Sequence, residues 1–248
     1  MKKISRTTRI LFLFLLIGMV GFSTSCTTQQ IAGVLGSIGG VPLTKEEISK
    51  ALKDALVQGV VKGTGLASKD GGYFNNSLIK IPFPEDAEKV ANKLRDLGLG
   101  SEVDRFVKTL NRGAEEAAKE AAPIFKSAIT SMSIQDAYGI LKGDRDAATQ
   151  YLMKTTTDQL KAKFKPIVAR NLEKVNATRY YSDLVSKYNQ IPFVKNVNPD
   201  LDDYATDKAI EGLFKLVAQE EDNIRTNISA RSTELMKRVF AQAPQAQQ

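Results

Sequence analysis

Apolar positions recur at helical spacing through most of the chain and predict a succession of amphipathic helices. The first helix follows Thr44, whose side chain fits a capping box with that of Glu47. A second helix opens at Pro84 and Glu85 and ends near Gly98. The apolar face of the first helix would carry Ile48, Leu52, Ala55, Leu56, Gly59 and Val60.

A longer apolar stripe follows and keeps its helical phase across Pro123. Ser101 and Asp104 resemble another capping pair at its start. Because a proline breaks the hydrogen-bond ladder only locally, we expect one kinked helix here rather than two unrelated helices. The stripe comprises Val103, Phe106, Val107, Leu110, Ala114, Ala117, Ala121, Ile124, Phe125 and Ala128.

The second half of the chain predicts further helices. Ser133 and Asp136 resemble the cap of a short helix that ends at Gly143. Pro166 is expected to break the stretch that comes next. The remaining helical stretches are expected at about 146–175, 178–189, 200–225 and 229–240.

Residues 69–83 interrupt the helical period. Two short stretches, Tyr73–Phe74 and Leu78–Ile81, flank the turn-forming residues 75–77, and this pattern predicts a small β-hairpin. The predicted fold is therefore all-α: a single-domain helical bundle over residues 43–241, with kinked long helices and one small β-hairpin.

The N-terminus has the pattern of an export signal. Basic residues precede an apolar run from Ile10 to Phe22, which is shorter than the roughly 20 residues of an ordinary membrane span. Cys26 follows small residues and resembles the lipidated cysteine of a bacterial lipobox, although Ser23 stands where a leucine-like residue is usual. We expect a lipoprotein signal peptide over 1–25, a lipidated N-terminus and flexible tether over 26–42, and a disordered tail over 242–248.

The residue after the cysteine bears on the destination. It is Thr27, not the Asp that resembles an inner-membrane retention signal, and no acidic run follows. We therefore expect a lipid anchor in the outer membrane, on its periplasmic face. The alternative is an ordinary secretory signal followed by an incidental cysteine. Lipidation also explains why Cys26 has no other cysteine with which to pair.

Composition narrows the chemistry. The chain has a formal charge of +7, and removing the four basic residues of the leader lowers it to +3. Basic and acidic residues are interspersed, so we expect no nucleic-acid partner. Without histidine, a Ser-His-Asp triad and histidine-bound metals are excluded, and only an all-oxygen metal site would remain. The acidic residues at 200–203 fit a helix start better than a calcium loop, so we expect no metal and no cofactor.

Several segments resemble one bacterial family. They are DGGYFNNSLIKIPFP, NRGAEEAAKEAAPIFKSAI, SIQDAYGILKGDRDAATQYL, DLDDYATDKAIEGLFKLVAQEEDNIR and RSTELMKRVF. In this order, over residues 43–241, they are similar to the family of domain of unknown function 4197. The resemblance implies an exported, helical, single-domain lipoprotein or periplasmic protein without an assigned activity, and it transfers no catalytic residue.

Glu221 is the most unusual polar residue, because it falls within the apolar stripe of the helix predicted over 200–225. A buried carboxylate needs a partner or water. Glu220 lies at the edge of the stripe, and the possible partners are Arg225, Arg231 and Arg112. Three interpretations stay open: a buried ion pair that fixes helix register, a polar pocket that binds a small ligand, or catalysis by Glu221.

A second polar cluster, formed by Asn111, Arg112, Glu115 and Glu116, flanks the long apolar stripe. It is either a solvated helix flank or a contact with a neighbouring helix. Glu115 and Glu221 could also act as paired carboxylates if the fold brought them together.

The sequence favours a non-enzymatic, membrane-anchored lipoprotein that acts by binding an envelope protein or a small ligand. One alternative is a hydrolase or lyase that uses carboxylates, and another is a purely structural envelope protein. The enzyme alternative requires convergence in an open cleft of at least two residues among Glu115, Glu116, Asp136, Glu220 and Glu221.

Overall fold

The computed structural model describes residues 42–96, 98, 100–174, 176, 181–183, 185–186, 189–190, 192–193, 198 and 200–242. The predicted signal peptide, Cys26, the tether before Pro42 and the tail after Gln242 lie outside the described residues. The helix predicted over 178–189 is described only in part. Within the described residues the secondary structure is helical, with no strand, and the prediction of an all-α fold is confirmed.

Two of the predicted capping boxes begin helices. Thr44 precedes α3 (Lys45–Ser68), where the Glu47 amide donates to the Thr44 hydroxyl at 3.1 Å and the Thr44 amide donates to the Glu47 carboxylate at 2.9 Å. Ser133 and Asp136 form the same reciprocal pair before α7 (Ile134–Lys142), which ends at Gly143 as expected. Each box satisfies amides that the first turn of a helix leaves without partners.

The long apolar stripe forms one helical path in consecutive segments. After η1 (Glu85–Ala87) and α4 (Glu88–Asp96), the path consists of α5 (Gly100–Ala117), η2 (Ala118–Glu120) and α6 (Ala121–Ser131). Pro123 lies in the first turn of α6, where its missing N–H leaves no bond unmade. The predicted cap at Ser101 is wrong, because α5 already begins at Gly100.

The remaining helices are α8 (Ala147–Glu173), α10 (Leu201–Thr226), η3 (Ile228–Ala230) and α11 (Glu234–Gln242). The break predicted at Pro166 is wrong, since α8 continues through it. Buried Phe164 and Val168 on either side keep that helix packed, so the loss of one backbone bond is tolerated. The last helix starts later than predicted, because the residues before it form η3.

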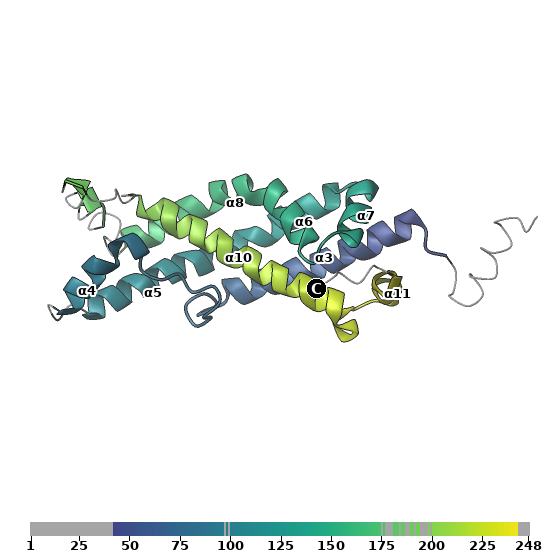
Figure 1. The fold of residues 1–248 in the computed structure, drawn as a ribbon, viewed down its shortest axis with the longest axis horizontal. Coiled ribbons are helices and arrows are strands. Elements are labelled where there is room, and N and C mark those ends of the chain that lie inside the picture. Colours follow the sequence, from purple (N-terminus) through teal and green to yellow (C-terminus); the bar gives the residue numbers. More distant parts are fainter. Residues whose placement is uncertain are drawn as a thin grey trace, which may run out of the picture. The chain divides into compact units, whose positions relative to one another are not determined.

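Helix α10 is central to the packing, because it contacts α3, α5 and α8 (Figure 1). Helix α3 also contacts α6, α7 and α11, and α5 contacts α8. Phe125 of α6 meets Phe214 of α10 edge-to-face, with ring centroids 5.6 Å apart. Fully buried side chains of this kind each contribute about 1.5–3 kcal/mol to stability.

The predicted β-hairpin at residues 69–83 is wrong. Among these residues the backbone forms turns, in which the Asn75 amide donates to the Gly71 carbonyl at 3.0 Å and the Lys80 amide to the Asn76 carbonyl at 2.8 Å. Gly71 adopts a φ of 73°, which favours glycine. A Cβ on Gly72 would lie 2.4 Å from a main-chain carbonyl oxygen, so the second glycine is required by close backbone packing.

Candidate functional site

The carboxylate of Glu221 is buried and fully engaged. It accepts hydrogen bonds from the amides of Ala148, at 3.0 Å, and Thr149, at 2.8 Å, and from the Thr149 hydroxyl at 2.8 Å. These amides belong to the first turn of α8, where a helix presents unpaired donors and partial positive charge. Glu221 of α10 therefore caps α8 across the helix interface.

Arg225 completes this arrangement, which we call the Glu221 cap. Its guanidinium donates to Glu221 from Nε at 3.0 Å and from Nη2 at 2.8 Å, and Nη2 also donates to the carbonyl of Ile140 at 2.9 Å. The Glu221 cap thus joins the end of α7, the start of α8 and one face of α10. Beside the Glu221 cap, Arg145 of the α7–α8 connection forms an ion pair with Asp222 of α10.

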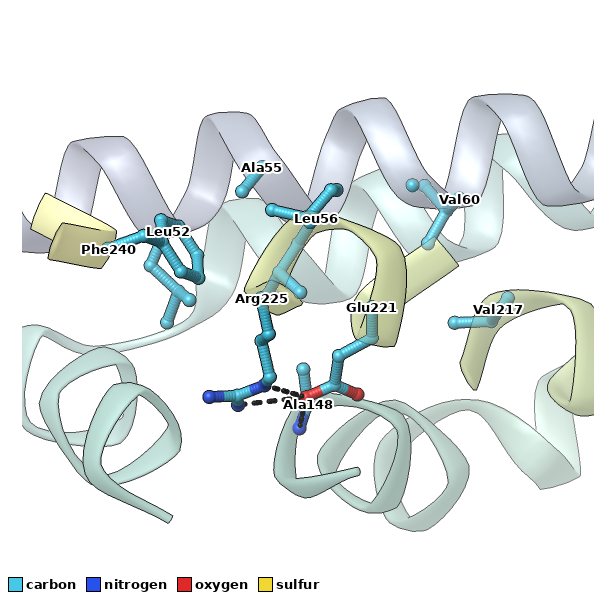
Figure 2. Close-up of a pocket in the computed structure, with 11 residues that line it drawn as sticks. Leu52, Ala55, Leu56, Val60, Ala148, Val217, Glu221, Arg225 and Phe240 are labelled. Atoms are coloured by element: carbon cyan, nitrogen blue, oxygen red, sulfur yellow. Dashed lines mark hydrogen bonds and ion pairs between the residues drawn. The ribbon is translucent and has the colours of Figure 1, made fainter. Parts of the chain in front are cut away.

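The Glu221 cap borders a small gap between helices (Figure 2). The gap is about 20 Å³ in volume, which is enough for about one water molecule and far below the roughly 300–1,000 Å³ of a small-molecule pocket. Its lining is otherwise apolar: Leu52, Ala55, Leu56, Gly59, Val60, Ala148, Val217, Ile224 and Phe240. Glu221 therefore forms an ion pair beside a packing gap rather than in a ligand-sized cavity.

The neighbouring candidates also contact helix ends or flanks. Glu220 pairs with Lys62 at 2.9 Å. Arg231 donates to the carbonyls of Ile224, at 3.0 Å, and Arg225, at 2.8 Å, and so caps the C-terminus of α10. Burial lowers the pKa of the Arg231 guanidinium.

The second predicted cluster fixes the irregular loop 69–83. The amides of Tyr73 and Phe74 each donate to Glu115 Oε1 at 3.1 Å. The side-chain amide of Asn111 forms two hydrogen bonds with the backbone of Ile81. Its Oδ1 accepts from the Ile81 amide and its Nδ2 donates to the Ile81 carbonyl, both at 2.8 Å, as a neighbouring strand would do. We call these contacts the loop latch. They use the donors that a hairpin ladder would have needed, which is why no strand forms.

Arg112 and Tyr73 strengthen the loop latch from two sides. Arg112 Nη1 contacts Glu115 at 2.9 Å and Asp70 at 2.5 Å. The Tyr73 ring is fully buried, and its hydroxyl donates to the carbonyl of Ala209 in α10 at 2.6 Å. Burial, with a smaller contribution from the charge of Glu115, raises the pKa of Tyr73 far above its usual range.

The sequence analysis did not predict that Tyr73 and the two glycines before it help to fix the loop 69–83. The available signal was the pair Asn111 and Glu115, which lie four residues apart on one face of a helix. Such a pair of polar groups beside an apolar stripe can hold a passing backbone segment.

The carboxylates proposed for the enzyme alternative have separate partners. Glu115 binds the loop, Glu116 accepts from Asn171 at 2.9 Å, and Asp136 caps α7. Glu220 and Glu221 contact Lys62 and Arg225 respectively. Within the described part of the chain, no group of three or more acidic, His or Cys side chains is placed to hold a metal ion. No helix among the described residues combines the length and the apolar character needed to cross a membrane.

A polar hollow lies beside the fixed loop. Its volume is about 470 Å³, which is within the range of small-molecule sites. Its described lining residues come from the end of α3 and from the loop: Leu66, Lys69, Asp70, Gly71, Gly72, Asn75, Asn76 and Ser77.

Fold and contacts together define an all-α domain in which buried charged side chains hold helix ends and one irregular loop in place. The sequence model of the family described as "Protein of unknown function (DUF4197)" matches residues 42–241, and the chain belongs to this family. The resemblance seen in the sequence segments is thereby confirmed. No curated protein and no solved structure matches the chain.

Proposed function

We propose that this protein is a lipoprotein held in the outer membrane by acyl chains on Cys26, with its helical domain on the periplasmic face. The basic leader, the apolar run after it and the cysteine behind small residues support this proposal. A buried methylene contributes about 0.8 kcal/mol to membrane binding, so several acyl chains anchor a protein stably. The proposal includes residues 43–241 as one helical bundle, since α10 contacts helices from both halves of the chain.

We further propose that the domain acts by binding rather than by catalysis. The observation that carries this proposal is the engagement of the candidate carboxylates. Glu221 and Glu115, the best candidates for paired acid–base groups, are each buried against backbone amides and an arginine. Carboxylate oxygens that already accept these hydrogen bonds are not directed toward a substrate, so they are poorly placed to act as a general acid or base.

Replacement of the cysteine tests the anchor. In Cys26→Ser cells, the protein should move from the membrane pellet to the soluble fraction and should no longer incorporate radiolabelled palmitate. Ser25→Ala is the matched control, because it keeps a small residue before the cysteine and should leave both readouts unchanged. A Cys26→Ser protein that still pellets with membranes would show that acylation does not hold it there.

A further inference from the structure

The loop from Lys69 to Phe83 is unusual, because it forms neither helix nor strand and is nevertheless held by buried hydrogen bonds. Connections between packed helices are usually about 2–8 residues long, and longer structureless ones are commonly either functional or disordered. This loop is instead fixed by buried contacts: Glu115 holds its first half, Asn111 holds Ile81, and Tyr73 is bonded to α10. A rigid loop that presents polar side chains is the arrangement expected of a binding site.

Size distinguishes this site from the Glu221 cap. The hollow beside the loop has a volume of about 470 Å³, against about 20 Å³ for the gap beside Glu221. Ligand sites occupy roughly 300–1,000 Å³, so the hollow has the volume of a small-molecule site and the gap beside Glu221 does not.

Several polar side chains that line the hollow are free to form hydrogen bonds with a ligand. Within the described part of the chain, the side chains of Lys69, Asn75 and Ser77 make no hydrogen bond or ion pair. Asp70 contributes one oxygen to Arg112 and keeps the other, and its side chain is exposed. The hydrogen bond from Arg112 lowers the pKa of Asp70, a carboxyl that is ionised at neutral pH even at its ordinary pKa.

The balance of the lining indicates the class of ligand. One ammonium and one carboxylate cancel in charge, so the described lining does not favour an anion or a cation. Leu66 is the only apolar side chain in the described lining, so an apolar ligand would bury little surface there. Amide, hydroxyl and carboxylate groups together match molecules that carry many hydroxyls, each of which donates and accepts hydrogen bonds.

We propose that the hollow lined by Leu66, Lys69–Gly72 and Asn75–Ser77 binds a neutral saccharide rich in hydroxyl groups. This inference rests on the proposed role in binding and names the site and ligand class for it. The loop latch fixes the site before the ligand arrives, so binding orders little additional chain.

The test is a titration of the full chain, isotope-labelled and purified in a detergent without a sugar headgroup. The probe is N,N′-diacetylchitobiose, added to about 10 mM, a range that detects weak binding. Saturable changes in amide chemical shift are expected at Gly71, Gly72 and Ser77. The double variant Asn75→Ala, Ser77→Ala should bind at least about 10-fold more weakly.

Asn92→Ala, Ser101→Ala is the matched control, since both residues are exposed and lie on other helices. It should bind as the wild type does. Thermal unfolding checks that the loop variant is folded, and Lys69→Gln supplies a second loop variant that should also weaken binding.

Three results would overturn the inference: no shifts up to the highest concentration, shifts confined to other parts of the chain, or binding by both loop variants that is as tight as that of the wild type. Shifts at the loop caused by glutamate or inorganic phosphate, and not by the disaccharide, would overturn the assignment to a neutral saccharide. Membrane attachment through Cys26 is measured separately, so failure at the hollow leaves the anchor proposal standing.

Discussion

Glu221→Gln should destabilise the protein strongly, because it removes the charge of a buried carboxylate while keeping its size. Glu221 accepts from two α8 amides, from the Thr149 hydroxyl and from Arg225. Gln keeps one oxygen acceptor but turns an N–H₂ group toward these donors. Removing one partner of a buried ion pair costs about 3–5 kcal/mol. Because one acceptor remains, we expect a loss of about 3 kcal/mol.

The assay is urea and thermal unfolding followed by circular dichroism. For a domain of this size, 1 kcal/mol corresponds to about 2–4 °C, so Tm should fall by about 6–12 °C. Glu234→Gln is the matched control, since Glu234 pairs with Lys237 at the surface with its side chain 83% exposed. Such pairs contribute less than about 1 kcal/mol.

A double variant separates the ion pair from packing. Glu221→Leu with Arg225→Met removes both charges. The double variant should cost less than the sum of the single substitutions, because each single substitution leaves an unpaired buried charge and the double variant leaves none. If Glu221→Gln unfolds within about 0.5 kcal/mol of wild type, the carboxylate does not hold the α7–α8 corner and the reasoning is refuted.

Two further predictions concern the loop latch and the cap of α7. Asn111→Leu should cost about 2–5 kcal/mol, because it leaves the buried amide and carbonyl of Ile81 without partners; hydrogen exchange should show lost protection at Ile81, and unchanged protection would contradict the loop latch. Asp136→Asn should reduce stability at neutral pH but not in acid, because the hydroxyl and the backbone amide of Ser133 lower the pKa of Asp136. A carboxyl with a lowered folded pKa stabilises above its unfolded pKa of about 3.9 and loses this as pH falls through the folded value. Unfolding of both proteins between neutral and acidic pH checks this, and a constant difference would count against it.

The helices were predictable where local signals coincide with periodicity. The capping boxes at Thr44 and Ser133 involve residues three apart in sequence, and both formed. Pro166 misled the prediction because the local loss of a hydrogen bond is outweighed by the packing of buried Phe164 and Val168, which depends on helices distant in sequence.

The loop 69–83 shows the opposite case. Its alternating apolar residues are those of a hairpin, but a strand needs partners for its amides, and here Asn111 and Glu115 provide them from a helix that is 30 to 42 residues later in the chain. No local pattern contains that information.

The sequence by itself determined the all-α class, most helix limits, the family and the identity of the unusual polar residues, because these depend on periodicity and on contacts within a few residues. Only the tertiary structure decided what those polar residues do. Glu221 could have faced a cavity, a metal or an arginine, and its burial against the first turn of α8 follows from how α10 packs on α8. The same holds for the polar side chains that line the hollow beside the loop. Glu115 and Asn111 hold this loop, and the hollow is formed only by the tertiary structure.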